Sequence, residues 1–442
     1  MKNSLFLFLL VIAACLLFEY FDSPLAPRKP VTLTMWHVYG SQTGSPMNDL
    51  VERFNRTVGK EQGITVNVTS VSNSSAIHDA LIDSARRVPG SGELPDLFTC
   101  YPKTLLAMGS DLVMDWNGWF SEAERGEYVP RFLEEGRIDG KQLAFPIAKS
   151  TDVLFVNATI FDRFAGDTGG SYEDLASWEG FFRVSRLYHA WSGGKPFFMY
   201  SSWLHYAMLN TASFGESLFR DGKINWGDTF RRVWEPLAEA GVAGEICLLK
   251  GYATTAMMTG EVVCGLESTA SIMYYKDTVT FPDNTSLPLR LKVLPMPVFE
   301  DGKPFAVQRG VSLCALRSTP EKEQAAYVFC KWITEEETNL GFVISAGYLP
   351  VKTEAYQRLL DGKRPAFPDE SYRSLYEAVG VLHAGYTFFI PPLFDEYGST
   401  EKAFSASLRS IFAEGRARRE REGAVFSAPA AWSLAAMRER VQ

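Results

Sequence analysis

The sequence lacks the motifs that mark most enzymes and metal centres. It has no G-x-S-x-G, H-E-x-x-H, P-loop or G-x-G-x-x-G motif, and no S-x-x-K in a plausible context. These absences exclude the common nucleophile, zinc-protease and nucleotide-binding templates. The few histidines show no metal-ligand spacing, and they stand at positions 37, 78, 189, 205 and 383. The sequence therefore predicts a protein that is not an enzyme and holds no metal or cofactor.

Cysteine and basic charge are also scarce. The six cysteines form no C-x-x-C pair, so a disulfide framework is not expected. Cys100, Cys264 and Cys314 sit in apolar, strand-like runs, which favours buried and unreactive thiols. The net charge of -8 and the pI of about 5.4 argue against a surface for nucleic acid, which needs clustered Lys and Arg.

What the sequence has in quantity is apolar and aromatic residues. With 442 residues, 46% hydrophobic, the chain is long enough for two domains that each have a core. Aromatic residues make up 13% of it, including ten Trp, and such rings suit surfaces that stack on the flat apolar faces of ligands.

The N-terminus predicts export. An apolar run from Leu5 to Phe18 follows Lys2 and has the length of the core of a secretory signal. The stretch Ile12 to Cys15 resembles a bacterial lipobox, in which Cys15 would carry the lipid anchor. Leu16, Leu17 and Phe18 follow where lipoproteins usually have polar residues, so an uncleaved membrane anchor stays open as the alternative. A linker with three prolines follows at 22–30.

The segment from Gly140 to Asn157 is predicted to cross between two lobes. It begins at a turn signal, contains Pro146 and the small polar pair Ser150 and Thr151, and ends in an apolar strand. Because proline cannot donate to a central strand ladder, the chain is expected to leave one sheet before it enters another. We expect Ser150 and Thr151 to lie at the floor of the cleft.

The chain on both sides of this segment has α/β patterning. Strands predicted at 31–36 and 64–68 flank a helix with Leu50, Val51 and Phe54 on one face. Strand, helix and strand in this order form the unit of a parallel sheet, so we expect doubly wound sheets.

Later segments repeat the pattern. Ser177 is predicted to cap a helix, and 197–203 is predicted to be a strand that ends at Trp203. A buried strand at 262–266 leads to a polar cluster with Ser268, which is either a ligand contact at a strand end or the cap of the next helix.

The C-terminal third adds two helices and a break. Pro320 is predicted to begin one helix, and a capping box from Thr334 to Glu337 the next, which ends at Gly347. Two later breaks, near 295–297 and near Leu316, complete the three crossings that a two-lobed protein requires.

Several segments, in order, resemble the bacterial extracellular solute-binding proteins of family 1, which serve ABC importers of sugars and polyols. The resemblance covers roughly residues 31 to 420. The motifs that carry it are Trp36-His37, Leu50 to Asn55, Gly92 to Leu97, Asp139 to Asn157, Ser177 to Phe181 and Gly310 to Lys352. It implies a two-lobed periplasmic-binding-protein fold of type II, with doubly wound sheets joined by a hinge of three crossings. The expected parts are an anchor at 1–22, a linker at 23–30, lobe 1 at 31–147 with 294–314, lobe 2 at 148–293 with 315–422, and a tail at 423–442.

The resemblance also implies ligand-binding residues. Within the family the chain is most similar to the binding protein for glycerol-3-phosphate and its diesters. The positions with suitable chemistry, together with the polar and aromatic residues expected beside them, are Ser150, Thr151, Trp203, Ser268, Gly310, Tyr348, Tyr101 and His37. For Trp203 a core indole is the alternative, and for His37 a structural hydrogen bond. Pro102 stands where that subfamily has glutamate, and the phosphate-gripping arginine has no counterpart in 386–392.

The missing arginine favours a neutral ligand, because a bidentate arginine is the usual grip on phosphate. The implied function is to bind a carbohydrate or polyol between two lobes and deliver it to a membrane permease, as a monomer in the periplasm or tethered at the cell surface. A glycerol-3-phosphate or glycerophosphodiester ligand stays open. So do a tethered sensory module and a glycoside hydrolase, whose carboxylates meet only in space.

Overall fold

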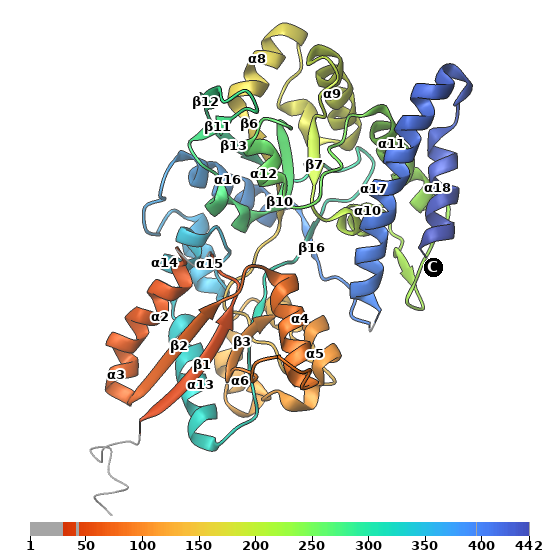
Figure 1. Ribbon diagram of the computed structural model, residues 1–442. Helices are drawn as coiled ribbons and strands as arrows, with labels where there is room; N and C mark the ends of the chain where they lie inside the picture. The colour runs from red at the N-terminus through yellow and green to blue at the C-terminus, as the bar shows by residue number, and fades with distance from the viewer. Residues whose placement is uncertain (1–29, 41–43, 395, 442) are drawn as a thin grey trace, which may run out of the picture.

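The computed structural model describes residues 30–40, 44–394 and 396–441, and it has two α/β lobes, each with a four-stranded sheet (Figure 1). The predicted anchor, its Cys15 and most of the linker lie outside the described residues. In the described part of the chain, every helix is too short or too polar to cross a membrane.

The first lobe surrounds a sheet with the strand order β15-β3-β1-β2. Its helices and strands are β1 (Val31–His37), α2 (Pro46–Arg56), α3 (Val58–Gln62), β2 (Ile64–Ser70), α4 (Ser74–Ala85), β3 (Leu97–Cys100), α5 (Pro102–Met108), α6 (Glu122–Gly126), α7 (Pro130–Glu134), β4 (Arg137–Ile138), β5 (Lys141–Gln142), β15 (Ser312–Ala315) and α13 (Pro320–Ile333). β1 pairs in parallel with β2 and β3, as the strand-helix-strand pattern predicts, and β15 adds an antiparallel edge.

The second lobe surrounds a sheet with the order β13-β6-β10-β7. Its helices and strands are β6 (Asp152–Asn157), α8 (Ala158–Thr168), α9 (Trp178–Trp191), β7 (Phe198–Tyr200), α10 (Trp203–Ser213), β8 (Phe219–Arg220), β9 (Lys223–Ile224), α11 (Asp228–Ala243), α12 (Ala253–Met258), β10 (Cys264–Ser268), β11 (Thr278–Thr280), β12 (Ser286–Pro288), β13 (Leu291–Leu294), α16 (Glu370–Gly385), α17 (Tyr397–Glu422) and α18 (Pro429–Arg440). β10 is parallel to β7 and antiparallel to β6.

Several chain segments run side by side where the lobes meet. Ser150 and Arg309 exchange two backbone hydrogen bonds of 2.8 Å, and β14 (Phe305–Val307) pairs in parallel with β16 (Thr387–Phe389). Lys149 forms a further bridge with Leu349, in the chain that joins α14 (Glu336–Ala346) to α15 (Thr353–Leu360). The predicted crossing at 140–157 is therefore one of several paired strands in the hinge.

Local helix signals give mixed results. Ser177 caps α9, Pro320 opens α13, and Gly347 ends α14 in the left-handed conformation, as predicted. The predicted capping box at Thr334 is wrong. Thr334 ends α13 instead, and its hydroxyl donates to the carbonyl oxygen of Cys330, so α14 begins without a side-chain cap.

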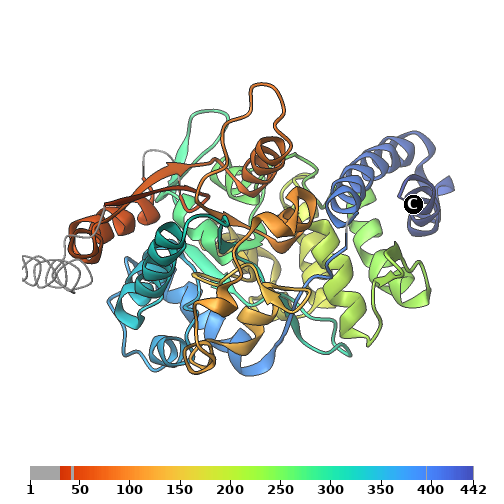
Figure 2. The same cartoon turned by 90° about the horizontal axis from the view of Figure 1, so that it is seen from below.

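Two segments lie elsewhere than the predicted lobe boundaries place them. α13 follows the expected switch at 314/315, yet it packs on β1 of the first lobe, beside the sheet in Figure 1. Residues 423–442, expected to be a tail, contain α18, which packs on α11 and α17 (Figure 1). Figure 2 shows α17 and α18, in blue, at the opposite side of the molecule from the red N-terminal elements.

Buried groups secure α18 to the second lobe. Leu434 is 6% and Met437 0% exposed, and the indole nitrogen of Trp234 donates a 2.9 Å hydrogen bond to the hydroxyl of Ser433. The cysteines of the described chain are all free and buried, which confirms the prediction for Cys100, Cys264 and Cys314.

We expect Met437→Ala to destabilise the protein by about 2–5 kcal/mol, because it removes a fully buried side chain and leaves a cavity. Urea unfolding followed by circular dichroism measures the change. Glu439→Ala, at an exposed position of the same helix, is the control and should stay within about 0.5 kcal/mol of the parent. Equal stability of the two variants would show that α18 is not part of the folded core.

Candidate functional site

A cavity of about 410 Å³ opens between the two lobes at the hinge. Its wall is formed by the start of α5, the end of α7, the crossing strands and the start of α17. The lining residues are Tyr101, Pro102, Lys103, Glu134, Glu135, Arg137, His205, Gln308, Arg309, Ile390, Pro391, Pro392, Leu393, Tyr397 and Glu401. Its volume suits a small organic molecule.

Arg309, in the wall of this cavity, pairs with the buried Asp152. Nη1 of Arg309 lies 2.5 Å from Oδ1 of Asp152, and the carboxylate is fully buried. Oδ2 of Asp152 accepts a 2.8 Å hydrogen bond from the hydroxyl of Tyr200 and lies 3.2 Å from Nδ1 of His205. Burial alone would raise the pKa of Asp152, but Arg309 and His205 outweigh it and hold that pKa well below its usual range.

A second buried ion pair joins Lys149 to Glu135, which lines the cavity. Nζ of Lys149, whose side chain is 0% exposed, lies 2.8 Å from Oε2 of Glu135 and donates to the carbonyl oxygen of Gly310 at 3.0 Å. Gln308 donates to the same carboxylate at 2.5 Å. Lys149, for which the sequence offers no role, thus ties the first crossing strand to the wall of the cavity.

The cavity is bordered by ion pairs that join the lobes directly. Lys103 on α5 lies 2.8 Å from Glu401 on α17, and Lys402 lies 3.9 Å from Asp79 on α4. Burial would raise the pKa of Glu401, but Lys103 is the main group that reverses the shift and lowers it. These contacts join helices of the first lobe to the last long helix of the second.

Two tyrosines, Tyr101 and Tyr397, line the cavity together with Arg309. Burial raises the pKa of Tyr397, and the charge of Arg309 opposes that rise. Tyr39 packs edge-on against Tyr348 with ring centres 5.0 Å apart. The cavity wall therefore combines the rings of Tyr101 and Tyr397 with polar groups, an arrangement that suits a ligand with both C–H and hydroxyl surfaces.

The structure brings four of the sequence-predicted residues together. Tyr101 lines the cavity, Ser150 pairs with Arg309 through its backbone, and Gly310 is next in the chain. Tyr348 is 8% exposed and precedes Leu349, whose backbone pairs with Lys149 beside Ser150. Their role as ligand contacts stays a prediction.

Three other predicted residues, His37, Ser268 and Thr151, are held within the fold. His37 is fully buried, with Nε2 2.8 Å from Oδ1 of Asn48. Ser268 caps the short helix 269–274 by accepting from the backbone N–H of Ala270, which is the second of the two roles considered for it. Thr151 is 0% exposed and its hydroxyl has no partner among the described residues.

Trp203 lies in the core of the second lobe. It begins α10 instead of ending a strand, it is 2% exposed, and its ring packs near Tyr200 and Phe198. This placement favours the core indole over the ligand contact, because the ring is not part of the cavity wall.

Sequence reasoning missed the charged residues of the cavity. Two of them could have been recognised: Asp152 begins an apolar strand, and Arg309 stands immediately before Gly310. A charged side chain that is buried at a predicted lobe crossing needs an oppositely charged partner. Lys103 and Glu401 give no such signal, because they are 298 positions apart.

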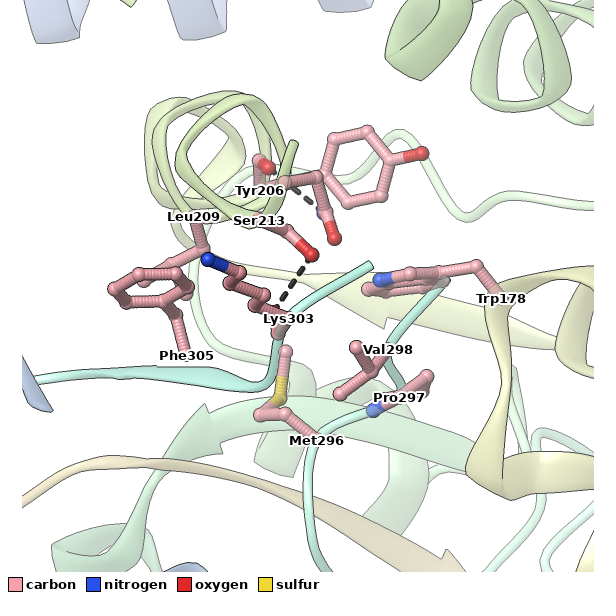
Figure 3. Close-up of a pocket in the computed structure, with 10 residues that line it drawn as sticks. Trp178, Tyr206, Leu209, Ser213, Met296, Pro297, Val298, Lys303 and Phe305 are labelled. Atoms are coloured by element: carbon pink, nitrogen blue, oxygen red, sulfur yellow. Dashed lines mark hydrogen bonds between the residues drawn. The ribbon is translucent and has the colours of Figure 1, made fainter. Parts of the chain in front are cut away.

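A much smaller pocket lies inside the second lobe, between α10 and the loop 296–303 (Figure 3). Its volume is about 10 Å³, the space of one water molecule. The indole nitrogen of Trp178 is turned towards it and has no partner among the described residues (Figure 3). This pocket is too small to be a ligand site.

The fold and the cavity define a two-lobed ligand-binding protein. The sequence matches the bacterial extracellular solute-binding proteins over residues 49–368, and the chain belongs to that family. The described residues contain no group of three or more His, Cys, Asp or Glu side chains placed to hold a metal ion.

Solved structures support the type II two-lobed fold. One is UgpB from Mycobacterium tuberculosis in complex with glycerophosphocholine, with a TM-score of 0.69, 16% identity, and 94% of this chain and 98% of that chain covered. Another is the cyclic alpha-maltosyl-1,6-maltose binding protein from Arthrobacter globiformis, with a TM-score of 0.65, 16% identity, and 93% and 98% covered. A third is an ABC substrate-binding protein from Listeria monocytogenes in complex with cycloalternan, with a TM-score of 0.68, 14% identity, and 93% and 99% covered. No curated protein matches the sequence.

His37 makes stability depend on pH. Burial lowers its pKa from 6.5 to about 4, against the opposing hydrogen bond to Asn48, so the folded state favours the neutral ring. The contribution of His37 is present above pH 6.5 and is lost as the pH falls towards 4, to a total of about 3 kcal/mol. Urea unfolding between pH 7.5 and 4 measures it. His37→Gln should remove this part of the pH dependence, and an unchanged slope would contradict the assignment.

Gly310→Ala is expected to disturb the hinge. Gly310 has φ of +98°, and a Cβ there would lie 2.8 Å from the carbonyl oxygen of Ala148 and 2.8 Å from Cα of Lys149. Gly140 has φ of +78° with open space around it. Gly140→Ala should therefore cost only the backbone strain of about 1–2 kcal/mol, and Gly310→Ala clearly more. Similar melting temperatures for the two variants would contradict this tight packing.

Proposed function

We propose that the protein binds a neutral carbohydrate or polyol in the cavity between its lobes and delivers it to the permease of an ABC importer. The family supplies the class of protein. The observation that supports the choice of ligand is the charge balance of the cavity wall.

Nearly every charged group on the wall is already paired within the protein. Arg309 pairs with Asp152, Lys103 with Glu401, Glu135 with Lys149, and Glu134 lies 3.6 Å from Arg131. Arg137 is exposed and is the one charged wall residue without an ion pair among the described residues. A neutral ligand leaves these ion pairs intact. Its hydroxyl groups can donate hydrogen bonds to the carboxylates and accept them from the cations while each ion pair stays together.

Two of the three neighbouring structures support a sugar, since one is a binding protein for cyclic alpha-maltosyl-1,6-maltose and another was solved in complex with cycloalternan. UgpB was solved with glycerophosphocholine, so a glycerophosphodiester is the ligand that competes with this proposal. We propose that the protein acts as a monomer outside the cytoplasm, tethered through its N-terminus.

A ligand screen by thermal shift tests the proposal. Because a ligand that binds only the folded state raises the melting temperature, about 2.7 kcal/mol of stabilisation is expected at a concentration one hundred times the dissociation constant. The probes are maltose, mannotriose, cycloalternan, sorbitol and glycerophosphocholine. We expect a shift with at least one carbohydrate or polyol, and chromatography should return that probe unchanged. A shift with glycerophosphocholine alone would contradict the neutral ligand, and hydrolysis of an oligosaccharide would contradict a binding role.

A further inference from the structure

Arg309 is a partly buried cation in the wall of the cavity. Its backbone is fixed in the hinge by two hydrogen bonds to the backbone of Ser150. The next residue, Gly310, accepts a hydrogen bond from the amine of Lys149. The side chain is 22% exposed, which leaves part of the guanidinium open to the cavity.

Asp152 fixes the orientation of this guanidinium. The carboxylate binds Nη1 only, and it is itself held by Tyr200 and His205 on its other oxygen. Within the described residues, neither Nη2 nor Nε of Arg309 has a protein acceptor. A guanidinium carries five N–H donors in a planar fork, so two adjacent donors remain available on the side away from Asp152.

The unused donors of this partly buried guanidinium lose part of their hydration without gaining a protein acceptor. Burying a polar group without a hydrogen bond is unfavourable, and the cavity beside Arg309 gives a ligand access to it. The rings of Tyr101 and Tyr397 line the same cavity as Arg309, so a ligand that reaches Arg309 also meets aromatic side chains.

We infer that Arg309 is the specificity-determining residue of the cleft and that Nη2 and Nε donate to two adjacent hydroxyl oxygens of a sugar or polyol. This inference rests on the proposed function. Asp152 neutralises the charge of Arg309, so the fork acts as a pair of oriented donors and not as an unpaired positive charge. A vicinal diol offers two oxygens with the spacing that a planar fork matches, whereas an isolated hydroxyl uses only one donor.

Titration calorimetry with maltose and mannotriose tests the assignment on the parent protein and three variants. Arg309→Gln should weaken binding of the better of the two sugars about 10- to 100-fold, because a charge-assisted pair of hydrogen bonds is lost. Arg309→Lys keeps the ion pair with Asp152 but not the planar fork, and should weaken binding almost as much. Arg290→Gln is the control, because Arg290 also pairs with an aspartate, Asp162 at 2.7 Å, on the surface outside the cavity. Its affinity should equal that of the parent.

Deoxy analogues of the same two sugars make the test independent of how well the variants fold. On the parent protein, removing one hydroxyl of the recognised pair should cost about tenfold or more, and the same removal should cost little on Arg309→Lys. Equal affinity of the parent and both Arg309 variants would overturn the inference and leave the proposed function standing. Binding of neither sugar by the parent, with tight binding of glycerophosphocholine, would overturn both.

Discussion

The pairing of Ser150 with Arg309 is the constraint on which the rest of the site depends. It holds two crossing strands together at the place where the chain passes between lobes, and it sets the charged side chains of Asp152 and Lys149 in the interior. A buried charge is tolerated only when it is paired and hydrogen-bonded. Asp152 is therefore paired with Arg309, and Lys149 with Glu135. Arg309 and Glu135 line the cavity, so both of these wall residues are stabilised by a buried partner.

The sequence predicted the parts of the fold that depend on local patterns. β1 and β2 alternate in burial and flank an amphipathic helix, and Ser177 and Pro320 act within one turn of their own helices. The pattern failed where a distant contact decides. Thr334 has the spacing of a capping box but bonds back to Cys330, and α18 is held by α11 and α17, which no local pattern at 423–442 reveals.

The candidate site was half predictable for the same reason. Ser150, Gly310 and the tyrosines are residue types that mark a cleft, and they could be singled out one at a time. Lys103 and Glu401 are ordinary surface charges in the sequence and become part of the site only because α5 and α17 come from opposite lobes. Trp203 shows the opposite error, because an indole beside a polar turn looks like a stacking surface until the packing around Tyr200 places it in the core.

The ion pair between Lys103 and Glu401 also bears on how the lobes close. It joins helices of opposite lobes, so a hinge opening that separates them must break it. The two side chains are 27% and 29% exposed, and partly exposed pairs contribute only about 0–1 kcal/mol. That is too little to hold the lobes shut, since a shift from mostly open to mostly closed requires several kcal/mol. Under the proposed function, the free energy of closure comes from the ligand, through contacts that exist only when both lobes touch it. Arg309 and the cavity tyrosines Tyr101 and Tyr397 are the groups that we propose make such contacts.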